Sequence, residues 1–94
     1  MKIADLKPGM SRVNLKVTVV EVSRPRLVNT RFGLAKVADA VIEDDTGRAK
    51  MSLWNEQISL VSPGDEITIE NGYTTQFRGE VQVNVGRYGR IVKG

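Results

Sequence analysis

The segment LAKVADAVIEDDTGRAKMSLWN, residues 34–55, decides the fold class, because apolar and polar side chains alternate on both sides of a tight-turn sequence. Alternation with a period of two is typical of a β-strand with one buried face. We therefore predict strands over residues 34–43 and 48–55, joined by the turn Asp44–Gly47. In the second strand the inward face carries Ala49, Met51 and Leu53. The outward face carries Arg48, Lys50, Ser52 and Trp54.

Three further alternating runs, at residues 13–22, 66–71 and 80–85, complete a set of five predicted strands. In the first run the apolar phase shifts between Val19 and Val20, which predicts a β-bulge or sharp bend that lets one strand serve two parts of a curved sheet. Residues 23–33 are basic and contain turn formers, so we expect a loop. Residues 73–79 are expected to form a hairpin connection, and residues 86–94 to extend the fifth strand.

Only residues 56–61, between the third and fourth strands, are expected to be helical, and then for one or two turns. Five strands with one short helical insert predict an all-β fold: a five-stranded Greek-key barrel of the OB type, as a single domain over residues 1–94. Closing the sheet into a barrel removes most exposed edges. An SH3-like barrel is the alternative, although its connections need no helix at that point.

The composition excludes most catalytic classes. The 94 residues contain neither Cys nor His, which removes thiolate metal sites, the commonest metal ligand and the commonest general base near neutral pH. The acidic cluster Glu43–Asp45 could hold Mg²⁺, but its sequence favours a turn. We expect no enzyme activity, no metal and no cofactor. The net charge of +3 favours a polyanionic partner. Without a long apolar run or a signal-like start, the chain is expected to be soluble and cytoplasmic.

Three aromatic residues are candidates for stacking on nucleobases: Trp54, Tyr73 and Phe77. Trp54 lies in the outward row with Arg48 and Lys50; the alternative is that it covers one end of the barrel. Phe77 and Tyr73 flank the connection between the fourth and fifth strands. The phase of Ile67 and Ile69 would turn Tyr73 inward as a plug, unless Gly72 breaks the register. Phe32 and Tyr88 are weaker candidates.

Basic residues are interleaved with these aromatics, as binding to a single nucleic-acid strand requires. The expected phosphate contacts come from the first loop, the third strand and the later loops: Arg26, Arg31, Arg48, Lys50, Arg78 and Arg87.

Five ordered motifs resemble one family: Asp5–Met10, Asp44–Gly47, Leu53–Trp54, Pro63–Asp65 and Asn71–Gly79. It is the family of archaeal single-OB-fold single-stranded DNA-binding proteins, related to replication protein A domains and to OB subunits of human DNA-damage-sensor complexes. Its base-stacking aromatics match Trp54, Tyr73 and Phe77, although many members have Trp where this chain has Tyr73.

The resemblance implies that the chain coats single-stranded DNA in replication, recombination or repair. We also expect a nucleoid-associated monomer that contacts proteins of the repair or replication machinery. Two alternatives stay open: an OB protein that binds single-stranded RNA, and an OB subunit that uses its groove to hold a partner protein. The charged row around Trp54 favours nucleic acid, since protein interface cores are depleted of charge.

Overall fold

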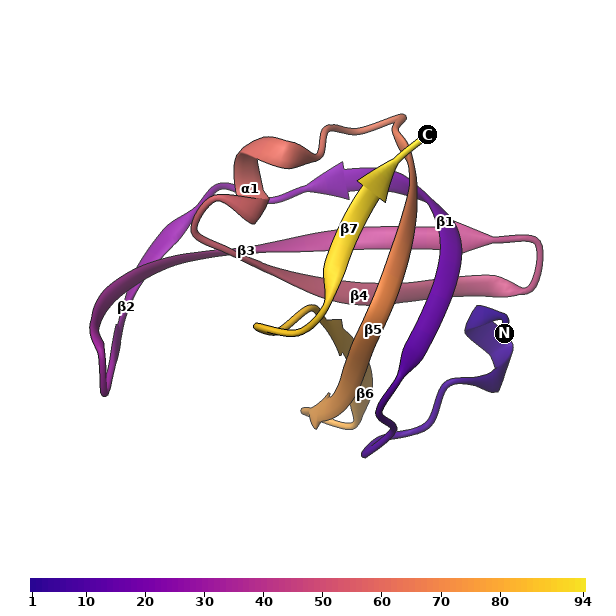
Figure 1. Ribbon diagram of the computed structural model, residues 1–94, viewed down its shortest axis with the longest axis horizontal. Helices are drawn as coiled ribbons and strands as arrows, with labels where there is room; N and C mark the ends of the chain where they lie inside the picture. The colour runs from indigo at the N-terminus through magenta and orange to yellow at the C-terminus, as the bar shows by residue number, and fades with distance from the viewer.

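All five predicted strands are present in the computed structural model, which describes residues 1–94 (Figure 1). They are β1 (Val13–Val22), β3 (Gly33–Asp44), β4 (Gly47–Trp54), β5 (Glu66–Phe77) and β6 (Glu80–Asn84). The short helix α1 (Gln57–Leu60) falls between β4 and β5, where the insert was predicted. Three elements were not predicted: the 3-10 turn η1 (Ile3–Asp5), β2 (Arg26–Thr30) and β7 (Arg90–Lys93). Neither of the two short helical segments could serve as a membrane-spanning helix.

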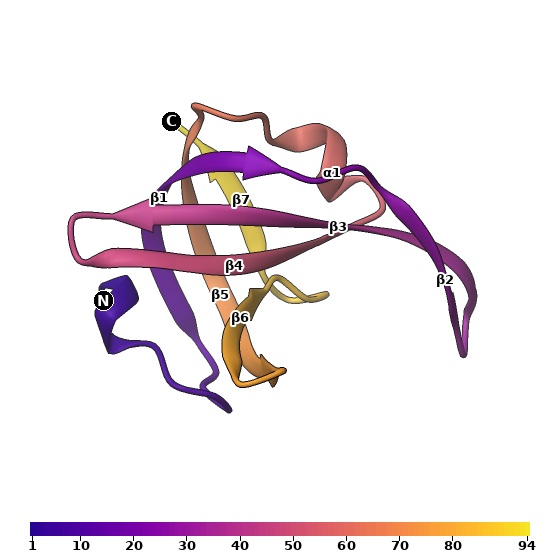
Figure 2. The ribbon, with the colours of Figure 1, turned by 180° about the vertical axis from the view of Figure 1, so that it is seen from behind.

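The five predicted strands pair in the closed order β1–β3–β4–β6–β5–β1, in which only the β4–β6 pair is parallel. The strand β1 closes this ring because its first part pairs with β5 and its last part with β3. Its register shifts between Val19 and Glu21, which confirms the predicted irregularity. Figures 1 and 2 show β1 curving from its place beside β5 to its place beside β3.

The core lies inside this ring and is almost entirely aliphatic. Most of the predicted inward positions of the five strands are buried: Val13, Leu15, Val17, Val19, Ala38, Ala40, Ile42, Met51, Leu53, Ile67, Ile69, Val83 and Val85. Ile3 of η1 and Val61 join them. The other two predicted inward residues, Ala49 and Val81, are only half-buried. Each fully buried Leu, Ile or Val stabilises the fold by roughly 1.5–3 kcal/mol, so the alternating pattern supplies the main stabilising interaction.

The turn Asp44–Gly47 is present as predicted and also holds the N-terminus. The Asp44 carboxylate accepts hydrogen bonds from the backbone N–H groups of Thr46, at 2.7 Å, and Ile3, at 2.8 Å. Partial desolvation raises the pKa of Asp44, but the hydrogen bonds from Thr46 and Ile3 outweigh it and lower the pKa to about 2.

The prediction of a loop over residues 23–33 is wrong for most of that segment. Arg26–Thr30 form β2, which pairs antiparallel with β3 from Gly33 to Val37. The pairing places Val28 opposite Ala35 and satisfies backbone groups that a loop would leave to water. The result is a two-stranded hairpin that projects beyond the ring (Figure 2).

The boundaries of the last strands also differ from the prediction. The strand β5 does not end at Asn71 but continues to Phe77, so the expected connection over residues 73–79 shrinks to the two residues Arg78 and Gly79. Residues 86–94 do not extend β6, because β7 folds back and pairs with the first half of β5. The strand β6 pairs only with the second half of β5, from Tyr73 to Phe77. Along the first half of β5, the strand β7 therefore supplies the hydrogen-bond partners.

Candidate nucleic-acid interface

Two adjoining hollows lie along the side of the molecule from which the β2–β3 hairpin projects. The face hollow, of about 590 Å³, lies over the outward side chains of β3, β4 and β6 and reaches Phe77 and Arg78. The end hollow, of about 890 Å³, lies beneath the hairpin at the end of the ring and is lined by Arg31, Phe32, Tyr73 and Arg87, among others. Both hollows are lined by Thr30 and Trp54, so together they form one groove.

Trp54 is the last residue of β4 and lies where the two hollows meet. Its partner across the ladder is Val37, and its side chain is partly buried outside the core cluster. Its backbone N–H donates to Oε1 of Gln57 at 3.0 Å, and Nε2 of Gln57 donates to the carbonyl of Val85 at 2.9 Å. The helix α1 therefore fixes the end of β4 against β6. The outward direction predicted for Trp54 is confirmed.

Tyr73 faces outward because the register of β5 breaks before it. Asn71 has a φ of +56°, and beyond it the inward positions are Gly72 and Thr74 instead of the odd-numbered residues. A Cβ at Gly72 would lie 3.0 Å from the carbonyl oxygen of Asn84, so the strands approach too closely for a larger residue. Tyr73 is 42% exposed and is no barrel plug.

Phe77 ends β5 at the far side of the face hollow and is 55% exposed. The next two residues, Arg78 and Gly79, have φ values of +52° and +81°, the conformation of the tight hairpin turns that match strand twist. The Cζ atom of Arg78 lies 5.2 Å from the centre of the Phe77 ring, a cation–π arrangement. One strand end therefore presents a ring and a positive charge together.

Apart from Arg48, the predicted basic residues divide into two groups. Two of those lining the face hollow are paired with carboxylates: Arg26 with Asp39 at 3.1 Å, and Lys50 with Glu80 at 3.3 Å. Exposed ion pairs of this kind contribute at most about 1 kcal/mol, so a phosphate can replace the carboxylate. The other group makes no ion pair and consists of Arg31, Arg78 and Arg87.

Arg48 is the exception among the predicted residues. It lies in the outward row of β4 but lines neither hollow, and its Nε is 2.9 Å from Oε2 of Glu43. The structure therefore brings Arg26, Arg31, Lys50, Arg78 and Arg87 to the groove and leaves Arg48 outside it.

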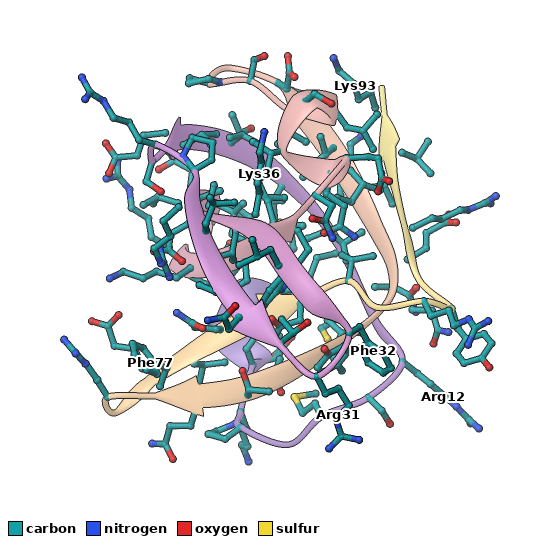
Figure 3. All side chains as sticks on the ribbon, turned by 90° about the vertical axis from the view of Figure 1, so that its left-hand side faces the viewer. Arg12, Arg31, Phe32, Lys36, Phe77 and Lys93 are labelled. Carbon is teal, nitrogen blue, oxygen red and sulfur yellow. The ribbon has the colours of Figure 1, made fainter.

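Phe32 is more prominent than the sequence indicated. It occupies the turn of the β2–β3 hairpin, is 93% exposed and lines the end hollow. Figure 3 shows Phe32 and Arg31 at the hairpin tip, with Phe77 at the end of the opposite hairpin. The pairing of β2 with β3 places Phe32 at a hairpin tip instead of in an irregular loop. No signal in the sequence indicated this, because residues 26–30 have no alternating buried face.

An OB domain from Thermoplasma acidophilum has a similar solved structure, with a TM-score of 0.85, 25% identity, and coverage of 100% of this chain and 85% of that one. A replication factor A related protein from Methanobacterium thermoautotrophicum gives a TM-score of 0.83 at 27% identity, over 100% of this chain and 89% of that one. The predicted all-β OB fold is confirmed, and the fold and groove define an OB-fold domain.

The sequence comparison narrows the class to a family. The family model for Ssb-like single-stranded DNA-binding proteins with an OB fold matches residues 6–93. The single-stranded DNA binding protein Ssb of Saccharolobus solfataricus is 38% identical over 92 residues, which cover 98% of this chain and 62% of that protein. This chain belongs to the Ssb-like family of OB-fold single-stranded DNA-binding proteins, which confirms the resemblance stated from the motifs.

Proposed function

We propose that this chain, as one domain over residues 1–94, binds single-stranded DNA with little sequence preference and without catalysis, in replication, recombination or repair. Bases stack on Trp54, Tyr73 and Phe77, since every base has a π-face that an aromatic ring can accept. Phosphates are met by Arg26, Arg31, Lys50, Arg78 and Arg87.

The observation that carries this proposal is the order of the aromatic rings along one groove. Phe77 lies at the outer end of the face hollow, Trp54 at the junction and Tyr73 in the end hollow. Unpaired arginines accompany each end, with Arg78 beside Phe77 and Arg87 beside Tyr73 in the end hollow. Rings alternating with cations are the combination that binds a flexible polyanion of stackable bases.

The proposal is tested by competition for a fluorescently labelled thymidine oligomer, with unlabelled oligo-dT, oligo-U and duplex DNA as competitors. We expect oligo-dT to compete at least about 10-fold better than the duplex, because paired bases cannot reach the rings. Equal competition by the duplex would show that the groove recognises phosphate alone and would overturn the proposal.

The same measurement decides between the alternatives. Stronger competition by oligo-U than by oligo-dT would identify an RNA-binding OB protein. Failure of all nucleic acids to bind would leave the groove as a surface for a partner protein. We expect the domain to bind DNA as a monomer, which light scattering with and without the oligomer checks.

A further inference from the structure

The groove does not end at Tyr73. A third hollow of about 250 Å³ lies beyond it, between the start of β1 and the loop from β6 to β7, and we call it the loop hollow. Tyr73, Gly86 and Arg87 line both the end hollow and the loop hollow. A Cβ at Gly86 would lie 3.1 Å from Cε1 of Tyr73, so the Tyr73 ring rests close to the backbone at Gly86, between the two hollows. A strand stacked on Tyr73 therefore has an open route onward.

The loop hollow has no opposing charge. It is lined by Arg12 and Arg87 and by no acidic residue, whereas Asp39 and Glu80 line the face hollow and Glu56 lines the end hollow. Neither Arg12 nor Arg87 makes an ion pair. Two free guanidinium groups around a small hollow suit a phosphate, which Arg binds through strong charge-assisted hydrogen bonds.

The hollow also offers a further aromatic ring, Tyr88, which is 84% exposed. The backbone on both sides of that ring is fixed. Nδ2 of Asn71 donates to the carbonyl of Tyr88 at 3.2 Å, and the N–H of Gly89 donates to the carbonyl of Gly86 at 3.1 Å. A Cβ at Gly89 would lie 2.7 Å from the carbonyl oxygen of Asn71, so this loop fits tightly against β5. An exposed ring on a held backbone is suited to stacking.

Asn71 also stabilises the opposite wall of the loop hollow through hydrogen bonds. Its N–H donates to Oδ1 of Asn14 at 3.0 Å, and Nδ2 of Asn14 donates to the carbonyl of Arg12 at 3.3 Å. Arg12 has a φ of +55°, a conformation that residues with a Cβ seldom adopt, and this backbone helps set the direction of its side chain. Figure 3 shows Phe77, the hairpin tip with Phe32 and Arg31, and then Arg12 in succession across one face.

We propose that the loop hollow is an additional nucleotide subsite, in which Tyr88 stacks on a base and Arg12, with Arg87, binds the phosphate that follows the nucleotide on Tyr73. This subsite rests on the proposed binding of single-stranded DNA and extends it by about one or two nucleotides, within the site sizes usual for one OB fold. Every basic residue that the proposed DNA-binding site uses lines at least one of the three hollows.

The test compares a thymidine oligomer of about four nucleotides, the lower end of the site sizes of OB folds, with one of about eight. The variant is Arg12→Asn combined with Tyr88→Ser. Asn tolerates the left-handed backbone at position 12, and Tyr88 is too exposed to support the core. The matched control is Lys16→Gln, which removes one unpaired, exposed cation from β1 outside the three hollows. Thermal unfolding of each variant accompanies the binding measurements.

We expect the double variant to bind the short oligomer within about twofold of the unmodified chain and the long oligomer roughly 10- to 100-fold more weakly. Its salt slope on the long oligomer should decrease by about 0.7, the share of one phosphate contact. Unchanged binding of both lengths would overturn the subsite. So would an equal loss on both lengths, or an equal loss in Lys16→Gln, because either would indicate a general charge effect. Failure of the unmodified chain to bind either oligomer would instead overturn the proposed function itself.

Discussion

At the scale of single residues, substitution of Trp54 distinguishes a role in DNA binding from a role in folding stability. Its ring lies at the junction of two hollows, outside the core, while its neighbour Leu53 is fully buried. We expect Trp54→Ala to weaken binding of oligo-dT roughly 5- to 150-fold, the loss of one base stack. Because the ring is partly buried, the variant should also lose about 1–2 kcal/mol of stability.

Leu53→Ala is the matched control, since it removes the adjacent side chain on the opposite face. It should cost about 2–5 kcal/mol of unfolding free energy and leave affinity nearly unchanged while the protein stays folded. If Trp54→Ala binds normally but unfolds as readily as Leu53→Ala, Trp54 belongs to the core and not to the groove.

The ion pair between Lys50 and Glu80 leads to a variant that should bind DNA more tightly, whereas Trp54→Ala should bind it more weakly. Both residues line the face hollow, and their side chains are about half exposed. Glu80 competes with phosphate for Lys50, so Glu80→Gln should raise the affinity for oligo-dT by about two- to fivefold at low salt. Measurement by anisotropy at low and high salt checks this, and a loss of affinity would show that Glu80 itself contacts the ligand favourably.

Asp44 determines part of the acid stability. Its pKa of about 2 lies below the ordinary 3.8, so its hydrogen bonds stabilise the fold fully above about pH 4 and lose this effect as the pH falls through 2. We expect Asp44→Asn to lower the melting temperature at pH 6 and to show a shallower decline between pH 4 and 2. The pKa of Asp65 is also lowered, chiefly by the Ser62 N–H, so some decline should persist in the variant. If the melting temperatures of the variant and of the unmodified chain fall equally steeply between pH 4 and 2, the role of Asp44 is contradicted.

At the scale of elements, β5 determines where the groove lies, because its break at Asn71 turns Tyr73 outward. The close packing of Gly72 against Asn84 and Ile69 accompanies this break. We expect Gly72→Ala to destabilise the fold by about 1–3 kcal/mol, because its new Cβ would meet a backbone oxygen at 3.0 Å. Thermal unfolding measures this, with Gly94→Ala as control, since a Cβ at Gly94 would meet no atom within 4 Å. An unchanged melting temperature in Gly72→Ala would contradict the close approach.

The sequence was sufficient to predict the elements in which apolar and polar side chains alternate. It was insufficient to predict those that are held mainly by backbone pairing. The strands β3 and β4 were predicted because their apolar faces are buried. The strand β2 projects beyond the core and buries little, so its sequence, with Pro25 before it, lacked that signal. The outward direction of Tyr73 depends on a φ value at Asn71, which no periodicity reveals. The continuity of the three hollows arises from loops that are far apart in sequence.

At the scale of the whole molecule, charge and shape act together. The net charge of +3 is modest, and six basic side chains are occupied in ion pairs. Several of the remaining ones gather around the groove: Arg12, Arg31, Arg78 and Arg87. A weakly charged molecule can therefore bind a polyanion through one side, and the affinity should depend on salt according to the number of phosphates that this side contacts.

Titration of intrinsic tryptophan fluorescence with oligo-dT at several salt concentrations tests base stacking in the groove most directly, because Trp54 is the one tryptophan of the chain. We predict saturable quenching, with a slope of log K against log salt of about −2 to −3.5, as contact with roughly 3–5 phosphates requires. Binding that anisotropy detects but that leaves Trp54 fluorescence unchanged, or quenching that is indifferent to salt, would contradict stacking in a basic groove.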